Sequence, residues 1–479
     1  MKRHKISFSQ SYVLLDGKEK VFYSGEVLYF RIRREDWLDR LKKAKEANLN
    51  AVSTYVPWNW HEPEEGTFDF NGNSDPRKDL ERFLELTEKE GLYVFVRPGP
   101  FITSEWKNGG IPQWVFTNYP EVMALNAENK PSFSTVYPQI SLLHPTYLSK
   151  VNEWYKAVCE ILRDHLYTKG GNIVMVQLDN EVSLRNYSKG IQNYNPLDLD
   201  YNPYLVGSKG KPGIYQKWLE EKYHDIELLN KKYKTSYSSF DEVRPPRSLP
   251  NHYSELHKHF DWFEFKEYIV LEFVNQLLNM MVKEGIDVPF YLNEPFWGDD
   301  FMITSISRIP KYFKNKHPPL VIGPDLYPSA RTLSSVIWKI PLYKSIQPDF
   351  PTIGWETQAS YSTHPNEMEM MYKLFFAYGL DGMNFYVFAG GHSPRGYGVF
   401  GGSYDFNAPV GYNGELRPSF DVIRYLGKLV ATHGHEIVSG KTLSEFGLGV
   451  YHPYIKLSLI HISEPTRPLY ISYAVFCLK

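Results

Sequence analysis

Short apolar runs and amphipathic segments alternate along most of the chain. The apolar runs lack the strict polar alternation of a half-exposed strand, which is typical of parallel strands that are buried on both faces. They predict eight strands, at residues 21–31, 51–56, 92–96, 173–178, 288–292, 320–322, 352–356 and 383–388. Each of these runs ends in polar, aromatic or acidic residues, so the ends of the strands are where we look for chemistry.

The segments between the strands carry apolar residues at helical spacing. They predict helices at residues 36–48, 79–90, 146–166, 214–233, 260–284, 366–378 and 419–433. Gly91 and Gly379 follow two of them, at the position where glycine commonly ends a helix. Strands that alternate with helices in this way predict an α/β fold, specifically a (β/α)8 TIM barrel. An open doubly wound sheet is the main alternative, but it gives no reason for every strand to end in such residues.

Two carboxylates stand at the ends of buried strands. The fourth strand ends in Asp179-Asn180-Glu181, and the seventh ends in Glu356. A barrel brings the carboxyl ends of all its strands to one rim, which is where barrel enzymes carry their catalytic groups. Two carboxylates across one pocket suit glycoside hydrolysis, with one as nucleophile and the other as acid/base. Four other carboxylates compete for these roles at the same rim: Glu26, Glu105, Glu294 and Asp325.

Two questions stay open at this point. Glu181 could instead cap or pair within a loop, as isolated Asn-Glu pairs often do. The gap between the two carboxyl groups decides the stereochemistry, since retention needs about 5–5.5 Å and inversion about 6.5–9.5 Å. The sequence does not measure that gap.

Eight motifs identify a known family. They cover most of residues 12–420, at residues 24–31, 53–59, 61–63, 97–100, 105–106, 109–110, 180–181 and 404–409. With them, the chain resembles glycoside hydrolase family 35, the β-galactosidase family of retaining barrel enzymes. The resemblance implies that Glu181 is the acid/base and Glu356 the nucleophile. It also implies a set of residues that bind the non-reducing sugar: Tyr55, Ser104, Glu105, Asn180 and Tyr386.

The chemistry of these side chains fits a sugar site. An anionic Glu105 can accept two sugar hydroxyls at once, which discriminates an axial from an equatorial hydroxyl. Asn180 can bond the sugar 2-hydroxyl, a contact that strengthens in the transition state. We expect Tyr386 to hold an oxygen of the nucleophile.

The chain departs from the family pattern in several places. The residues that differ from the family pattern are Leu28, Phe101, Thr103 and those of the loop 390–398. A further segment, residues 216–233, resembles family 42 β-galactosidases. These departures leave the carboxylate pair untouched but open the question of which sugar is bound. We predict a retaining exo-β-glycosidase that hydrolyses terminal β-D-galactosyl residues of an oligosaccharide or galactoside. An exo-β-glucosaminidase is one alternative, and a catalytically dead carbohydrate-binding barrel is an alternative from another class.

Composition removes several other classes of function. The formal net charge of −2 gives no reason to expect nucleic acid or an anionic membrane as a partner. There is no apolar stretch of about 18 residues, so we expect no membrane span. Histidines lack the spacing of ligands, so we expect no metal and no other cofactor. Cys159 and Cys477 make no disulfide framework, which favours a reducing, cytoplasmic location. A homo-oligomer stays open.

The end of the chain needs a separate interpretation. Residues 457–467 look like the translation of a transposase sequencing adapter, and residues 471–479 look like its flow-cell primer. We therefore expect residues 457–479 to be a non-native read-through tail. Residues 1–436 then form the catalytic barrel, and residues 437–456 begin a truncated C-terminal β domain. A natural pair of C-terminal strands is the alternative.

Overall fold

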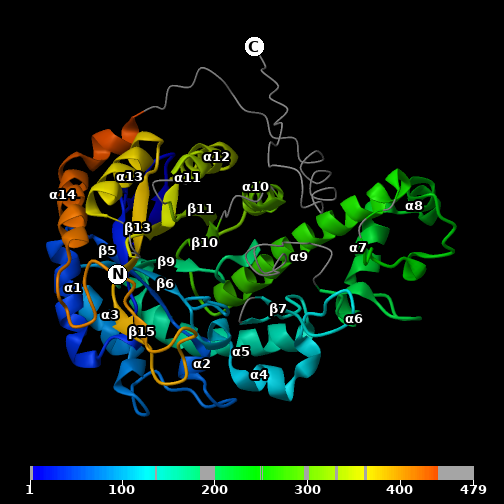
Figure 1. Cartoon of the computed structure of the whole chain (residues 1–479), viewed down its shortest axis with the longest axis horizontal. Helices are drawn as coiled ribbons and strands as arrows, with labels where there is room; N and C mark the ends of the chain where they lie inside the picture. The colour runs from blue at the N-terminus through cyan, green and yellow to red at the C-terminus, as the bar shows by residue number, and fades with distance from the viewer. Residues whose placement is uncertain are drawn as a thin grey trace.

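Eight parallel strands close into a barrel (Figure 1). The computed structural model describes residues 4–134, 137–183, 200–248, 250, 252–295, 301–328, 333–360 and 364–440. The barrel strands are β4 (Tyr23–Val27), β5 (Ala51–Tyr55), β6 (Tyr93–Arg97), β9 (Ile173–Gln177), β10 (Phe290–Pro295), β11 (Leu320–Leu326), β12 (Ile353–Gln358) and β13 (Gly382–Ala389). Strand β9 pairs with β6 on one side and with β10 on the other, which closes the ring. The predicted (β/α)8 barrel is thereby confirmed, and the open sheet is excluded.

Helices surround the barrel, and every segment predicted as helical contains one. The described helices are α1 (Trp37–Glu46), α2 (Trp58–His61), α3 (Leu80–Lys89), α4 (Gln113–Asn118), α5 (Pro145–Leu162), α6 (Pro203–Val206), α7 (Ile214–Tyr223), α8 (Ile226–Tyr233), α9 (Leu256–Lys283), α10 (Phe301–Phe313), α11 (Leu333–Ile337), α12 (Lys339–Ile346), α13 (Pro365–Ala377) and α14 (Pro418–Ser439). The sequence did not predict α10 and α12. Helix α14 continues past residue 436, the expected end of the barrel, and the tail from residue 441 lies outside the described residues.

Several strands differ in length from the predictions, and the differences matter for the site. Strands β10, β11 and β12 continue beyond their apolar runs, so that Asn293 and Asp325 lie inside the hydrogen-bonded part of the sheet. The ladder is made by backbone groups and can therefore run on where the side chains become polar. Strand β4 stops at Val27, because residues Tyr29–Arg31 form a 3-10 helix. This turn brings Arg31 into the protein interior.

The barrel is filled by side chains and closed at its N-terminal end. Tyr291 and Trp355 stack inside it with ring centroids 4.0 Å apart, and Phe95 meets Trp355 edge-on. A small antiparallel sheet of β1 (Ile6–Phe8), β2 (Val13–Leu15) and β3 (Lys18–Lys20) adds Val13 and Leu15 to the same apolar cluster. The interior is therefore a packed core, as in other barrels of this kind, and a ligand site has to lie at the C-terminal rim.

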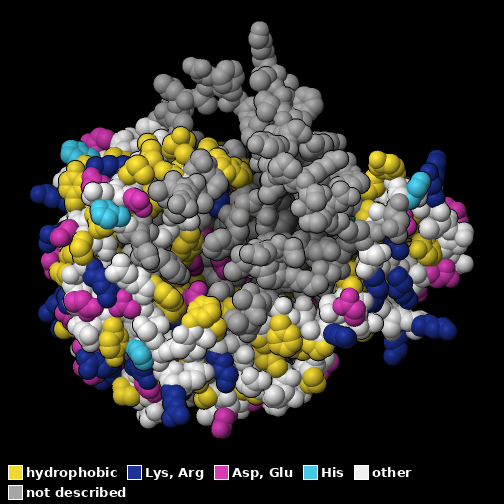
Figure 2. Space-filling view, in the orientation of Figure 1, with side chains coloured by type: hydrophobic (Ala, Val, Ile, Leu, Met, Phe, Trp, Pro, Cys, Tyr) yellow, Lys and Arg dark blue, Asp and Glu magenta, His cyan; other side chains and the backbone are white. Residues whose placement is uncertain are grey.

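A helical excursion leaves the barrel between β9 and β10. It contains α6, α7, α8 and the long α9, and it extends to the right of the barrel in Figure 1. Figure 2 shows side chains of both charges interspersed over the described surface on the barrel side of this view. Short strand pairs β7 (Phe133–Ser134) with β8 (Tyr137–Pro138), and β14 (Gly391–His392) with β15 (Ser403–Tyr404), complete the described strands.

Candidate active site

A pocket of about 370 Å³ lies at the C-terminal ends of the barrel strands. The residues that line it are Tyr55, Thr103, Ser104, Glu105, Asn180, Glu181, Tyr327, Glu356, Gln358 and Tyr386. All seven residues proposed from the sequence are among them. The structure thus brings the whole predicted set together, although its members come from five different barrel strands or the loops that follow them.

The loop after β6 reaches the pocket through an unusual backbone. Thr103, Ser104 and Glu105 all have positive φ angles, of 49°, 45° and 43°. Left-handed backbone costs a non-glycine residue about 1–2 kcal/mol, so it persists only where the surroundings enforce it. Arg31 supplies part of that enforcement, since Nη1 donates to Oγ of Ser104 at 2.7 Å and Nη2 donates to its carbonyl oxygen at 2.6 Å. The result is that the Glu105 carboxyl group faces the pocket.

Glu356 is surrounded by hydrogen-bond donors. Its Oε1 accepts from Nη2 of Arg97, from the Tyr55 hydroxyl at 2.9 Å and from Nδ2 of Asn293 at 3.1 Å. Its Oε2 accepts from the Tyr327 hydroxyl at 2.5 Å. Donors alone suit a carboxylate anion, which only accepts, and one of these four is the fully buried guanidinium of Arg97.

Glu181 has the opposite surroundings. Among the residues that the structure describes, its Oε2 accepts one long hydrogen bond, of 3.4 Å, from the Thr103 hydroxyl. Burial raises the pKa of its carboxyl group well above the usual range, and the nearby charges of Glu356 and Glu105 raise it further. Burial and the neighbouring carboxylates therefore favour the protonated form of this group. Two carboxyl groups whose environments differ in this way are the usual arrangement of a nucleophile and a general acid.

Asn180 is fixed by three neighbours. Its Oδ1 accepts from Nη2 of Arg97 at 2.8 Å and, at 2.7 Å, shares the single proton of the Tyr55 hydroxyl with Oε1 of Glu356. Its Nδ2 donates to the Thr103 hydroxyl at 3.1 Å. Because arginine can only donate, the oxygen of the amide has to face Arg97. The orientation of the amide is thus determined by its contacts.

Glu105 and Tyr386 belong to a second cluster. Tyr404 donates to Oε2 of Glu105, and its hydroxyl lies 2.6 Å from that of Tyr386. Arg31 lies over the Tyr404 ring, 3.5 Å from its centroid. Burial raises the pKa of Glu105, while the Tyr404 hydrogen bond and the charge of Arg31 lower it.

Tyr386 does not take the place that we expected for it. Its hydroxyl bonds Tyr404 and, at 3.3 Å, Ser104, rather than an oxygen of Glu356. The hydroxyls that bond Glu356 belong to Tyr55 and Tyr327. The sequence alone could not separate these tyrosines, since Tyr55 ends β5, Tyr327 follows β11 and Tyr386 lies in the second half of β13, all near the same rim.

Three of the four rival carboxylates lie behind the pocket and do not line it. Glu26 accepts from Asn384 at 3.0 Å, and Asp325 accepts from Asn293 at 2.9 Å. Glu294 is fully buried, and burial raises its pKa to about 8. The fourth rival, Glu105, does line the pocket.

Three residues that the sequence did not single out as functional turn out to organise the site. Arg97 and Asn293 hold the Glu356 carboxylate, and so does Tyr327. Arg97 and Asn293 are polar residues at the ends of buried apolar strands, which is the signal that led to Glu181. The same signal could therefore have found them.

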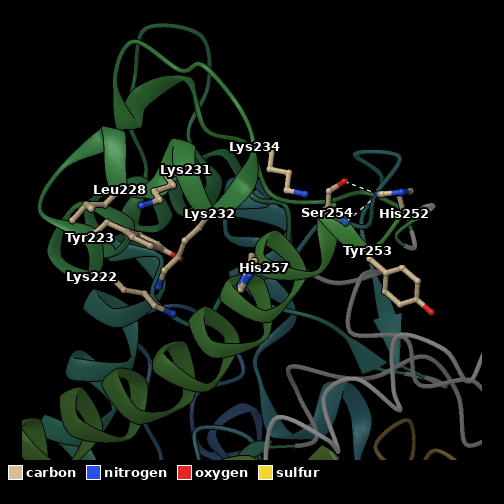
Figure 3. Close-up of a pocket in the computed structure, with 10 residues that line it drawn as sticks. All are labelled: Lys222, Tyr223, Leu228, Lys231, Lys232, Lys234, His252, Tyr253, Ser254 and His257. Atoms are coloured by element: carbon tan, nitrogen blue, oxygen red, sulfur yellow. Dashed lines mark hydrogen bonds between the residues drawn. The ribbon is translucent and has the colours of Figure 1, made fainter.

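A second hollow, of about 690 Å³, lies on the helical excursion (Figure 3). Its lining residues are Lys222, Tyr223, Leu228, Lys231, Lys232, Lys234, His252, Tyr253, Ser254 and His257. Lys222 is already paired with Asp261 at 2.6 Å, and Figure 3 shows Tyr253 pointing away from the lysines. None of the described residues that line this hollow carries a carboxyl group, so they offer no acid and nucleophile for hydrolysis.

Within the part of the chain that the structure describes, no group of three or more His, Cys, Asp or Glu residues is arranged to hold a metal ion. None of the helices described is both long and apolar enough to cross a membrane.

Comparisons with known proteins agree with this geometry. Residues 12–202 match the model of glycosyl hydrolases family 35. An exo-β-D-glucosaminidase of Pyrococcus horikoshii is 35% identical over 93% of this chain and 57% of its own length. A β-galactosidase of Mus musculus is 36% identical over 42% of this chain and 27% of its own length. The chain thus spans little more than half of the first of these relatives.

The fold is also similar to solved structures of β-galactosidases. The crystal structure of a β-galactosidase from Halorubrum lacusprofundi superposes with a TM-score of 0.69 at 16% identity, over 95% of this chain and 64% of that one. At this identity the likeness concerns the fold alone. Over residues 12–202, which carry Glu105, Asn180 and Glu181, this chain is thus similar to glycosyl hydrolases family 35, and its curated relatives at 35–36% identity are glycosidases.

Proposed function

We propose that the protein is a retaining exo-β-glycosidase that releases terminal β-D-galactosyl residues. The observation that carries this proposal is the contrast between the two carboxyl groups of one pocket. Glu356 receives four donors, one of them cationic, while the pKa of Glu181 is raised by burial and by neighbouring carboxylates. This contrast supports Glu356 as the nucleophile and Glu181 as the acid/base. The exo mode follows from the family resemblance.

The reaction has two steps in this scheme. Glu356 attacks the anomeric carbon while Glu181 gives its proton to the glycosidic oxygen, so that the bond to the leaving alcohol breaks and a glycosyl-enzyme forms. Glu181, now ionised, then takes a proton from water as the water attacks the anomeric carbon. The bond to Glu356 breaks, and both carboxyl groups return to their initial states. Two inversions give net retention.

The tyrosines and Arg97 assist by holding the nucleophile. Tyr55 and Tyr327 bond different oxygens of Glu356, so the carboxylate cannot rotate freely. Because the nucleophile is already held in the attacking geometry, the entropic part of the activation free energy is smaller. Arg97 balances the charge of Glu356 while the sugar is absent.

The contacts of Asn180 favour a sugar with a 2-hydroxyl over one with a 2-amino group. Tyr55 and Arg97 already occupy its oxygen, so the amide offers the pocket an N–H donor. A hydroxyl oxygen can accept that hydrogen bond. The ammonium group of glucosamine can only donate, and it would need an acceptor at this place. This is the reason for preferring a galactoside.

An exo-β-glucosaminidase is the second candidate. It is supported by the 35% identity to the Pyrococcus horikoshii enzyme over 93% of this chain. A binding barrel without catalysis is the third, and it lacks a supporting observation, since both carboxyl groups and their partners are present. A cytoplasmic location and any homo-oligomer stay predictions.

A panel of aryl β-glycosides tests the proposal. We expect turnover of the galactoside to exceed that of the glucoside, fucoside and glucosaminide. We also expect the first sugar product seen by NMR to be the β anomer. If the glucosaminide is turned over faster than the galactoside, the exo-β-glucosaminidase becomes the better assignment. A first product with the α configuration would exclude retention, and galactose binding without any turnover would favour the binding barrel.

A further inference from the structure

Asn293 connects the two catalytic residues from beneath the pocket. Its Nδ2 donates to Oε1 of Glu356 at 3.1 Å, and its Oδ1 accepts from the backbone N–H of Glu181 at 3.2 Å. Gln177 also donates to this Oδ1. Asn293 is fully buried and does not line the pocket. It therefore acts on both carboxyl residues without contact to the sugar.

The backbone of Glu181 needs such support. Its φ angle is 48°, in the left-handed region that non-glycine residues avoid. A residue keeps this conformation only when its surroundings determine it. The hydrogen bond from its N–H to Asn293 is one of the contacts that do so.

Asp325 determines the orientation of Asn293. Its Oδ2 accepts the second hydrogen bond of the Asn293 amide nitrogen, at 2.9 Å. A flipped amide would turn its oxygen toward Asp325 and Glu356, and its NH2 group toward the donors of Gln177 and Glu181. Acceptors on one side and donors on the other thus permit a single orientation.

Asp325 lies beside the nucleophile but outside the pocket. It is the register partner of Glu356 on the neighbouring strand, and only 2% of its surface is exposed. Its Oδ1 has no hydrogen-bond partner among the described residues. An acid in this position has no route to the substrate, so its effect on catalysis has to pass through a neighbour.

We propose that Asp325 is a positioning residue that fixes Asn293 in the one orientation that holds both the backbone of Glu181 and the carboxylate of Glu356. This inference rests on the catalytic roles given to Glu181 and Glu356 above. This positioning role requires no movement of the carboxyl groups of Glu181 and Glu356, because Asp325 acts through the amide of Asn293 alone.

The charge of Asp325 fits this role. Burial raises its pKa well above the usual range, and the charge of Glu356 raises it further, against the effect of Arg97. A protonated Asp325 still accepts the Asn293 hydrogen bond through Oδ2. It does so without placing a second negative charge beside the nucleophile. An asparagine at this position would have nearly the same shape and the same acceptor.

The test compares kcat and KM for the aryl β-glycoside that the wild-type protein turns over best. We expect D325A to lower kcat by about 10- to 100-fold, the usual cost of losing a partner that orients a site. KM should change by less than about twofold, because the pocket is unaltered. D325N should stay within about threefold of the wild type, since its amide oxygen can accept from Asn293.

A double-mutant cycle shows whether Asp325 acts through Asn293. If it does, D325A/N293A is no slower than N293A alone, because the two substitutions remove one shared contact. The proposal would be overturned if the loss of kcat in the double variant equalled the product of the losses in the two single variants. It would also be overturned by a D325A variant with wild-type kcat.

A matched control separates catalysis from folding. Asp381 is also a buried aspartate, but it lies at the start of β13, where it pairs with Lys344 at 2.8 Å. D381N should lower thermal stability while leaving kcat unchanged, and circular dichroism should report the folded fraction of every variant. If D325A does not fold, the kcat of D325N tests the proposal instead. A folded D325N whose kcat is lower by tenfold or more contradicts the proposal. A wild-type protein that hydrolyses none of the glycosides contradicts the proposed function instead.

Discussion

Arg97 donates a hydrogen bond from Nη2 to Oε1 of Glu356, and its guanidinium is fully buried beside that carboxylate. The pair joins the end of β6 to β12, across the inside of the barrel. The same guanidinium also reaches Asn180 at 2.8 Å and Gln177 at 2.9 Å. One cation therefore connects Glu356 to β9 and to Asn180, the residue before Glu181.

Replacing Arg97 should affect both stability and activity. R97M leaves the buried Glu26 and Glu356 without their cation, and breaking a buried ion pair costs about 3–5 kcal/mol of folding free energy. R97K keeps the charge but loses the planar fork, so we expect a smaller loss of stability together with a lower kcat. Urea unfolding and steady-state kinetics measure the two effects. Equal stability of R97M and the wild type would contradict the role of the pair.

Removing the nucleophile should leave a site that azide can repair. E356G should lose activity by about 10⁴-fold or more, because no covalent intermediate can form. Azide is small enough to enter the vacated space and attack the anomeric carbon, so we expect turnover to return with an α-azide product identified by NMR. E294G is the control, and azide should have no effect there. Rescue of E294G in place of E356G would reassign the nucleophile.

Removing the acid should affect substrates according to their leaving groups. E181Q cannot give a proton to the glycosidic oxygen, and the loss of a general acid costs about 10²–10⁴-fold where that proton is needed. Aryl glycosides with acidic phenols leave without it and should lose little in the first step. The measurement is kcat/KM over a series of phenols of increasing pKa. A loss of the same size for every phenol would remove Glu181 from this role.

Changing Asn180 should change the preferred sugar. N180D replaces the N–H donor that faces the pocket by a carboxylate oxygen, which is an acceptor. This acceptor suits a 2-ammonium group of the sugar, whereas the oxygen of a 2-hydroxyl loses its donor. We expect the ratio of kcat/KM for the glucosaminide to that for the galactoside to rise by about tenfold or more, since a lost or gained polar partner is worth at least that much in a buried site. An unchanged ratio would show that Asn180 does not contact position 2 of the sugar.

Glu294 should make stability depend on pH. Burial raises its pKa from 4.5 to about 8, so the folded protein holds a proton that the unfolded chain releases at lower pH. Its stabilising effect is complete below pH 4.5 and is lost as the pH rises toward 8, at up to about 1.4 kcal/mol per pH unit. E294Q keeps the neutral shape, so its unfolding free energy should fall less over this range. The measurement is the difference in unfolding free energy between the wild type and E294Q at each pH, because other buried carboxyl groups contribute equally to both proteins. Parallel pH curves would show that Glu294 is not protonated in the fold.

Local patterns carried the prediction of the barrel and of two carboxylates at its rim. Buried parallel strands are apolar on both faces, so eight such runs stood out, and the polar residues that end them had to meet at one rim. Glu181 and Glu356 could be placed in this way before any contact was known, whereas the sugar-binding set, with Tyr55 and Asn180, came from the resemblance to the family. The N-terminal sheet and helices α10 and α12 were missed, because their patterns are short or irregular.

The sequence by itself put six carboxyl groups near one rim, and the tertiary structure alone decided which of them line the pocket and how each is held. The four donors around Glu356 come from β5, β6, β10 and the end of β11, and they are separated from it by 29 to 301 residues along the chain. The pKa of Glu181 is raised by burial and by charges that other strands contribute. A pKa and a hydrogen-bond partner are properties of the space around a side chain, and that space exists only once the barrel has closed.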